Sequence, residues 1–160
     1  MLMIHESNYD MGKKEKIRVI ALAVILQDEH IFVTEYINPT NDELYYRPLG
    51  GGVDFHETGI DAVQRELLEE INAPLSDVSY LGMLENIFET DEGRGHQICL
   101  MYKVIFAEPE RMQVNYSVVG QEGKKEFNAL WKPLAMFRAG DAPLYPNGLL
   151  ALLDNSETSK

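Results

Sequence analysis

The chain has 160 residues, a length that favours one domain, and 45% of them are apolar, enough to form a core. Its 26 acidic and 14 basic side chains give a formal net charge of −12 at pH 7. Because binding to a nucleic-acid backbone depends on Lys and Arg that displace counterions, this charge argues against DNA or RNA as a partner. Small polyphosphates are not excluded, since metal ions can bring them to an acidic protein.

Cysteine content and hydropathy indicate the compartment. Cys99 is the only cysteine, so no intrachain disulfide can form, as is typical of reducing compartments. Cys99 is expected to be a small buried residue of an apolar strand. The N-terminal segment lacks the apolar core of a signal peptide. The longest apolar run, residues 19–26, is far shorter than the ~20 residues that a membrane helix needs. These features predict a cytoplasmic protein that does not bind membranes.

The first half of the chain predicts strands. Residues 1–15 are polar and are expected to form a loose tail or a short edge strand. Residues 17–26, "IRVIALAVIL", predict a strand buried on both faces, because apolar and β-branched residues follow one another almost without interruption. A turn signal, "QDEH", and a second strand, "IFVTEYI", make 18–37 a predicted hairpin. The segment "LYYRPL" then leads as a short strand into Gly50, Gly51 and Gly52.

A helix is predicted to begin near Thr58. Thr58 and Asp61 fit a capping box. The apolar residues after them recur at steps of three and four and form one stripe, made of Ile60, Val63, Leu67 and Ile71. Asn72 suits a left-handed residue at the helix end, and Pro74 prevents much continuation.

The second half of the chain predicts two strands, at 78–89 and 96–108, around a loop "TDEGRG". Residues 128–137 are expected to end in a strand or a short helix, and 147–155 to form a C-terminal helix. Residues 154–160 are expected to be a loose end. Strands that surround a few helices in mixed order predict an α/β or α+β fold rather than a regular βαβ series.

Several familiar motifs are absent from the sequence. No Gly-Lys-Ser/Thr follows the glycine triplet, and "GGGVDF" does not satisfy G-x-G-x-x-G. The histidines lack the spacing of zinc ligands; they are His5, His30, His56 and His96.

The predicted helix carries a group of acids instead. At about 100° per residue, Glu66, Glu69 and Glu70 fall in one narrow sector of the helix surface, where like charges repel. One interpretation is an ordinary solvated face, in which Arg65 forms modest ion pairs with its neighbours. The other is a divalent-cation site, because Mg²⁺ is usually held by one or two carboxylates together with water and substrate phosphates. The cluster alone leaves both open.

The spacing of these residues resembles the Nudix signature. From Gly51, five residues precede Glu57, seven more precede Arg65, and "RELLEEINA" follows. Eight of the nine specified positions match: Gly51, Glu57, Arg65, Glu66, Leu67, Glu69, Glu70 and Ala73. The ninth should be glycine and is Asn72, a residue that tolerates the left-handed conformation. The resemblance extends over residues 18–153.

The resemblance implies a single Nudix domain over residues 1–160, with a mixed β-sheet between α-helices. It implies hydrolysis of a phosphoanhydride bond in a nucleoside di- or triphosphate or a nucleoside-diphosphate-linked substrate, by attack of water on phosphorus. The implied cofactor is Mg²⁺, with Mn²⁺ as the alternative. The family often forms dimers, so a homodimer is among the expected states.

The resemblance also implies residue roles. Glu66, Glu69, Glu70 and the carbonyl of Gly50 would be the metal ligands. Arg65 would hold Glu57 by an ion pair and so fix the loop against the helix. The expected catalytic set is therefore Glu57, Arg65, Glu66, Glu69 and Glu70.

One departure leaves the general base open. Related sequences carry glutamate where this chain has Gln97, and glutamine can neither carry a charge nor hold a proton at neutral pH. Glu126, Glu85 and Glu89 are alternative acids. If none of them serves, the enzyme is expected to work more slowly. Gln97 also leaves a second function open, that of a non-catalytic Nudix-fold sensor that binds nucleotides.

Substrate contacts are the least defined part of the interpretation. A base could stack on an aromatic side chain, and the candidates are Tyr36, Tyr45, Tyr46, Phe88 and Trp131. The residues selected as substrate-binding are Arg47, Tyr46, His96 and Glu126, with Arg47 directed at a phosphate. Oxidised nucleoside triphosphates, ADP-ribose, dinucleoside polyphosphates and nucleotide sugars all remain possible substrates.

Overall fold

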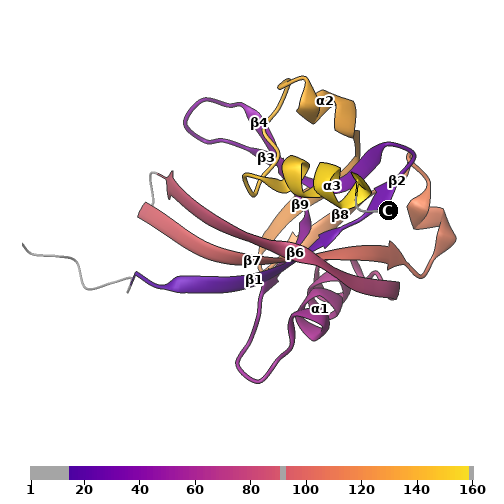
Figure 1. The fold of residues 1–160 in the computed structure, drawn as a ribbon, viewed down its shortest axis with the longest axis horizontal. Coiled ribbons are helices and arrows are strands. Elements are labelled where there is room, and N and C mark those ends of the chain that lie inside the picture. The colour runs from indigo at the N-terminus through magenta and orange to yellow at the C-terminus, as the bar shows by residue number, and fades with distance from the viewer. Residues whose placement is uncertain (1–14, 91–92, 159–160) are drawn as a thin grey trace, which may run out of the picture.

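A computed structural model describes residues 15–90 and 93–158 (Figure 1). The strands are β1 (Ile17–Val24), β2 (Leu26–Gln27), β3 (His30–Ile37), β4 (Leu44–Arg47), β5 (Leu49–Gly52), β6 (Leu75–Thr90), β7 (Gly93–Phe106), β8 (Ser117–Glu122) and β9 (Lys125–Pro133). The helices are α1 (Gly59–Ile71), the 3₁₀ helix η1 (Pro109–Met112), α2 (Leu134–Arg138) and α3 (Leu149–Thr158). One sheet has the order β5-β1-β7-β6, and the other has the order β2-β3-β9-β8 with β4 paired to β3. The predicted mixed fold class is confirmed.

The first sheet is the mixed one, and it places the glycine triplet. Strand β1 runs parallel to β7, with Ile20 opposite Cys99, and antiparallel to β5, with Leu22 opposite Gly50. The long β6–β7 hairpin completes the sheet. Strand β5 therefore lies at the sheet edge, where α1 packs against it.

The predicted hairpin over 18–37 is wrong. Both edges of β1 are occupied, by β5 and by β7, so β1 cannot also pair with β3. Only the short β2 pairs with β3, with Leu26 opposite Ile31. The chain passes from one sheet to the other at Ile25, which is buried and whose carbonyl accepts a hydrogen bond from the Phe32 N–H at 3.0 Å. The predicted burial on both faces holds from Ile20 to Ile25.

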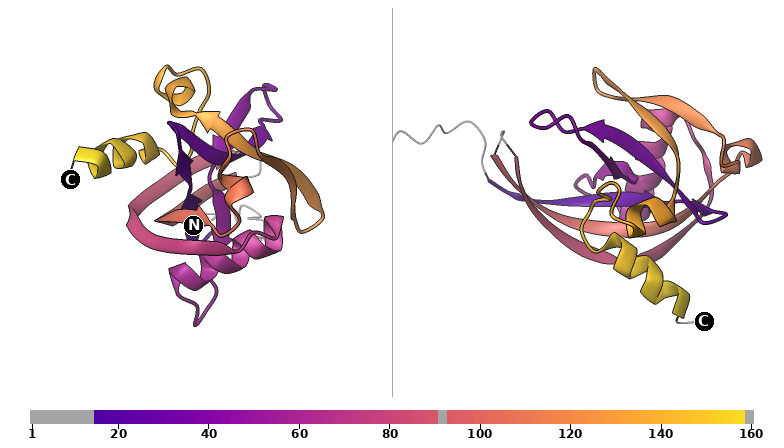
Figure 2. Two further views of the ribbon diagram at one scale, coloured as in Figure 1. Left: turned by 90° about the vertical axis from the view of Figure 1, so that its right-hand side faces the viewer. Right: turned by 90° about the horizontal axis from the view of Figure 1, so that it is seen from above.

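Two apolar cores lie on opposite faces of the sheets. Successive residues of a strand point to opposite faces, so the residues of β1 divide between them. Ala21 and Ala23 belong to the core that includes α1, whereas Leu22 and Val24 belong to the core that includes α2 and α3. The sheets thus lie between α1 on one side and α2 with α3 on the other (Figures 1 and 2). Cys99 is buried in the second core, as predicted.

Helix α1 begins and ends as the sequence predicts. The Thr58 hydroxyl accepts the Asp61 N–H at 3.1 Å and donates to the Asp61 carboxylate at 2.8 Å. Asn72 closes the helix in the left-handed conformation, with φ 51° and ψ 41°. The apolar stripe is shifted by a small rotation: Ile60 is 41% exposed, and Ala62 is buried in its place. The other members of the stripe, Val63, Leu67 and Ile71, are buried.

The remaining differences concern ends and turns. Strand β7 already includes Gly93–Gly95, part of the segment predicted as a loop, because pairing with β6 continues to the turn. Helix α3 continues to Thr158, so 154–158 are helical rather than loose. The predicted tail over 1–14 and the end at 159–160 lie outside the described residues. Strand β8 was not predicted from the sequence. Within the described residues, no helix is long and apolar enough to cross a membrane.

Candidate active site

Two glycines bring β5 against its neighbours. Gly50 has φ 134°, a conformation that favours glycine, and a Cβ there would lie 2.0 Å from the carbonyl oxygen of Ala21. A Cβ on Gly51 would lie 2.5 Å from the carboxyl carbon of Glu66. The absence of side chains at these two positions therefore lets β5 approach β1 and lets the Glu66 carboxylate rest on the backbone of β5.

Arg65 connects the loop, the strand and the helix. Its Nε and Nη2 donate to the two carboxylate oxygens of Glu57 at 2.7 and 2.9 Å, and Nη2 also donates to the Gly52 carbonyl at 2.9 Å. The Asp54 N–H donates to Glu57 at 3.0 Å. The Arg65 hydrogen bonds, followed by that N–H, lower the pKa of Glu57 to about 2. Glu57 is therefore ionised at neutral pH, and its carboxylate fixes the loop before α1.

Two of the three clustered acids share the same guanidinium. Arg65 Nη1 donates to Glu66 Oε1 at 2.9 Å and to Glu69 Oε2 at 3.2 Å. Glu66 is largely covered, whereas the Glu69 side chain is 60% exposed. In this arrangement Arg65 compensates the charge repulsion that the sequence predicts for the cluster.

Glu70 differs from its neighbours because it is buried. It is 8% exposed and accepts a hydrogen bond from the Gly50 N–H. Its Oε2 is buried and has no hydrogen-bond partner within the described residues. Burial first, and then the charge of Glu66, raise the pKa of Glu70 to about 8, against the lowering effect of Arg47. A buried carboxylate oxygen without a partner is unfavourable.

This donor set fits a hard divalent cation. Such ions take carboxylate and carbonyl oxygens as ligands, and a cation at Glu70 would satisfy its unpartnered oxygen. The side chains are not already arranged around one point, since no group of three or more His, Cys, Asp or Glu side chains forms a ready metal site in the described part of the chain. To bind the ion, Glu66 and Glu69 would have to give up their hydrogen bonds to Arg65.

The four predicted substrate-binding residues lie in different places. The Arg47 charge acts on Glu70, so the structure brings Arg47 to the site. Tyr46 is 2% exposed in the core on the α2 side, where its hydroxyl donates to Glu35 at 2.8 Å. His96 lies 2.7 Å from the Glu85 carboxylate on the β6–β7 hairpin. Glu126 neighbours Phe127, which packs on the α1 side, so alternation directs Glu126 to the other face.

One acidic residue whose charge acts on Glu70, Glu122, was not identified from the sequence. Burial is the main cause that raises the pKa values of Glu70 and Tyr36, and the negative charge of Glu122, at the end of β8, adds to both shifts. A Cβ on Gly120 would meet Ile71 of α1 at 2.8 Å, and Glu122 points to the same face two residues later. Strand alternation would have identified Glu122 only if β8 had been predicted. Gln97, at the position where related sequences carry glutamate, accepts a hydrogen bond from the Asn86 side-chain amide at 3.3 Å.

Comparison with known proteins agrees with this geometry. The NUDIX domain family model matches residues 16–148. A NUDIX hydrolase from Nitrosomonas europaea superposes with a TM-score of 0.59 at 20% identity, over 91% of each chain. A MutT NUDIX hydrolase from Burkholderia pseudomallei superposes with a TM-score of 0.56 at 22% identity, over 86% of this chain and 97% of that one. No protein with a curated description matches the chain.

The family model covers most of the chain, so this protein belongs to the Nudix family. The predicted class of enzyme, a Nudix pyrophosphohydrolase, is thereby confirmed. Nudix hydrolases act on small nucleotide substrates and generally use divalent metal cations.

Proposed function

We propose that this protein hydrolyses a phosphoanhydride bond in a nucleoside di- or triphosphate, or in a nucleoside-diphosphate-linked substrate, with Mg²⁺ or alternatively Mn²⁺. The observation that carries the proposal is Glu70, a buried carboxylate whose Oε2 has no partner among the described residues. Two further glutamates and the glycine-rich strand β5 lie beside it. The proposed ligands are Glu66, Glu69, Glu70 and the carbonyl of Gly50.

The cation would acidify a bound water and neutralise phosphate charge. The protein supplies position and charge around it. The Gly50 N–H holds one side of Glu70, and the Arg65 bonds to Glu57 and Gly52 hold the loop and β5 against α1. We assign Glu57 and Arg65 as positioning residues. Arg47 places a positive charge near Glu70 that can meet a substrate phosphate.

The general base is proposed to be Glu122 rather than the acids selected from the sequence. Glu122 is the carboxylate outside the signature whose charge acts on Glu70. The Glu85 carboxylate already contacts the His96 ring, and Glu126 lies on the face of β9 that points away from α1. Gln97 supports the alternative function, a nucleotide sensor without turnover, because its amide cannot replace a base.

The proposed function agrees with the partners and the cellular location that the sequence predicts. A net charge of −12 supports a small nucleotide that reaches the site with metal ions, and argues against nucleic acid and anionic membrane surfaces. We expect the protein in the cytoplasm, and a homodimer remains a prediction.

The test is a hydrolysis screen over nucleotides and nucleoside-diphosphate conjugates, with Mg²⁺, with Mn²⁺ and with chelator. We expect turnover that requires metal and that falls at least about a hundredfold in Glu70→Gln, since loss of a ligand removes the metal's contribution. Glu110→Gln, an exposed acid on η1, is the matched control and should keep wild-type turnover. Equal turnover in chelator would refute the proposal, and nucleotide binding without turnover would favour the sensor.

A further inference from the structure

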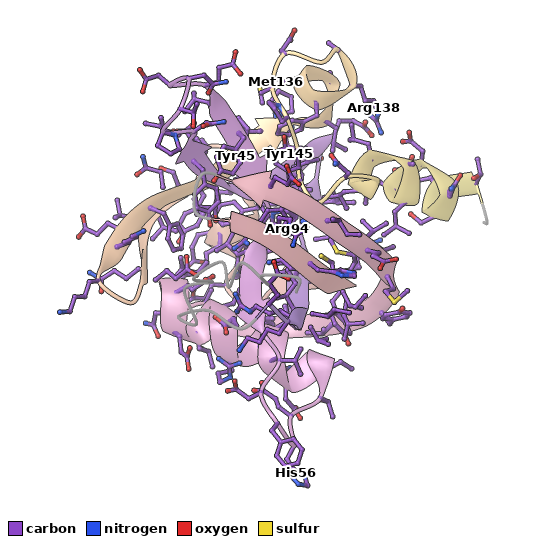
Figure 3. The ribbon with its side chains drawn as sticks, turned by 90° about the vertical axis from the view of Figure 1, so that its left-hand side faces the viewer. Tyr45, His56, Arg94, Met136, Arg138 and Tyr145 are labelled. Atoms are coloured by element: carbon purple, nitrogen blue, oxygen red, sulfur yellow. The ribbon has the colours of Figure 1, made fainter. Side chains whose placement is uncertain are left out.

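Three tyrosines from separate parts of the chain meet at one edge of the second sheet. Tyr36 of β3 and Tyr45 of β4 are cross-strand partners, and their rings stack at a centroid distance of 5.1 Å and an angle of 15°. Tyr145 meets Tyr45 edge-on, at 5.8 Å and 71°. Figure 3 shows Tyr45 and Tyr145 beside each other. We call Tyr36, Tyr45 and Tyr145 the tyrosine cluster.

Arg47 joins the tyrosine cluster to the candidate metal site. It lies two residues after Tyr45 on β4 and therefore on the same face. Its guanidinium carbon lies 5.7 Å from the centre of the Tyr36 ring, and Nη2 donates to the Tyr36 hydroxyl at 3.4 Å. On its other side, Arg47 lies three residues before Gly50, whose N–H donates to the Glu70 carboxylate, and the Arg47 charge opposes the rise that burial causes in the Glu70 pKa. Glu70, Arg47 and the tyrosine cluster thus form a continuous tract.

The chemistry along this tract changes in a defined order. At one end lies a buried carboxylate, suited to a cation. In the middle lies Arg47, whose only side-chain hydrogen bond within the described residues is the one to Tyr36 and whose Nε is buried without a partner. At the other end lie rings that are partly open to solvent, with Tyr145 37% exposed.

The neighbouring tyrosine shows what a purely structural role looks like. Tyr46 is 2% exposed, packs on Phe137 and donates its hydroxyl to Glu35. The tyrosine cluster differs because its outer rings face solvent next to a cation and phosphate site. Tyrosine rings of this kind suit the base of a nucleotide, since every nucleobase has a flat face that stacks on an aromatic side chain.

We propose that the tyrosine cluster is the base-binding subsite of the substrate, with the phosphate chain running past Arg47 towards Glu70. This inference rests on the proposed function and deepens it by assigning the residues that hold the base of the nucleoside.

The test measures equilibrium binding in the presence of Mg²⁺, with nucleoside monophosphates that contain no phosphoanhydride bond to hydrolyse. AMP, GMP, CMP and UMP are titrated by calorimetry in parallel with ribose 5-phosphate, which has the sugar and the phosphate but no base. We expect the wild type to bind at least one nucleotide about tenfold more tightly than ribose 5-phosphate, as stacking predicts. Tyr45→Ala and Tyr145→Ala should remove most of this difference and leave ribose 5-phosphate binding unchanged.

Two further variants make the result specific. Tyr45→Phe keeps the ring and should retain base binding. Tyr80→Ala is the matched control, because Tyr80 is 61% exposed on β6 and makes a similar edge-on contact, with Tyr102 at 5.8 Å and 68°. Thermal unfolding verifies that each variant is folded. The inference is overturned if the wild type shows no base preference, or if Tyr80→Ala reduces that preference as much as Tyr45→Ala and Tyr145→Ala do.

Failure of this inference is distinguishable from failure of the proposed function. Metal-dependent turnover with no effect of the tyrosine variants on base binding would leave the hydrolase intact and place the base elsewhere. Base binding that depends on Tyr45 and Tyr145, without turnover in the metal screen, would leave the subsite intact and refute the hydrolase.

Discussion

Arg65 and Glu57 form an ion pair through two hydrogen bonds, of 2.7 and 2.9 Å, across seven intervening residues of loop and helix. Since the same guanidinium reaches the Gly52 carbonyl, Glu66 and Glu69, one side chain sets the relative positions of β5, the loop and α1. Planar guanidinium geometry is required, because an ammonium cannot donate to all of these oxygens.

Arg65→Lys is therefore expected to be a severe substitution despite conserving charge. We predict a loss of turnover of at least about tenfold and a lower unfolding temperature, because the loop loses its bidentate anchor. Arg138→Lys provides the control, since Arg138 makes a surface ion pair with Asp154 at 2.9 Å, and such pairs contribute about 1 kcal/mol or less. Similar kinetics and unfolding temperatures in the two variants would contradict the role of Arg65.

Alanine substitutions of the two close-packed glycines, Gly50 and Gly51, should affect the protein in different ways. In Gly51→Ala the new Cβ meets the end of the flexible Glu66 side chain, which can move, so we predict a folded protein with weakened metal binding. In Gly50→Ala the Cβ meets the backbone of Ala21 at 2.0 Å, at φ 134°. Such strain costs about 1–3 kcal/mol before the clash is added. Denaturant unfolding and metal titration of both variants would measure the contrast, and equal stability losses would contradict it.

Glu70 makes the stability of the metal-free protein depend on pH. Its pKa is about 8 in the folded state against 4.5 ordinarily, so the folded state binds the extra proton between these values. Stability from this group is present below about pH 4.5 and is lost as the pH rises through 8. We predict that in chelator the free energy of unfolding falls from pH 5 to pH 8 more steeply in the wild type than in Glu70→Gln.

The exposed neighbour gives the comparison for this measurement. Leu68→Gln places the same uncharged amide at a 49% exposed position of α1 and should leave the pH slope unchanged, because it removes no titrating group. Parallel slopes in the wild type and in Glu70→Gln would show that Glu70 is ionised in the folded protein at neutral pH.

Glu122 is the predicted general base. Glu122→Gln should lower turnover by about a hundredfold or more, as loss of a base typically does, with little change in metal affinity. Steady-state kinetics at saturating Mg²⁺, with Glu110→Gln as the control, would measure it. A larger loss in Glu126→Gln than in Glu122→Gln would restore the sequence-based candidate.

Local signals in the sequence were sufficient for the signature region. The capping box at Thr58, the left-handed Asn72 and the burial of Val63 and Leu67 all follow from residues within a few positions of one another. The ion pair between Arg65 and Glu57, in contrast, was expected only from the resemblance to the Nudix signature.

The parts that were not predictable depend on pairing between distant strands. Nothing near β1 reveals that β5 and β7 occupy both of its edges, so the hairpin with β3 was a reasonable error. Tyr46 and Tyr45 differ only by strand alternation, and the choice between them needed the register of β4 with β3. Glu122 could not be identified from the sequence because β8, the strand that carries it, has few apolar residues and was not predicted.

The most direct test of the central claim, a divalent-cation site at Glu70, is a Mn²⁺ titration followed by electron paramagnetic resonance of the free ion. The wild type is predicted to bind Mn²⁺ and to release it when Mg²⁺ is added. Glu70→Gln is predicted to bind it at least about tenfold more weakly, whereas Glu110→Gln matches the wild type. Equal Mn²⁺ affinity in the wild type and in Glu70→Gln would contradict the account.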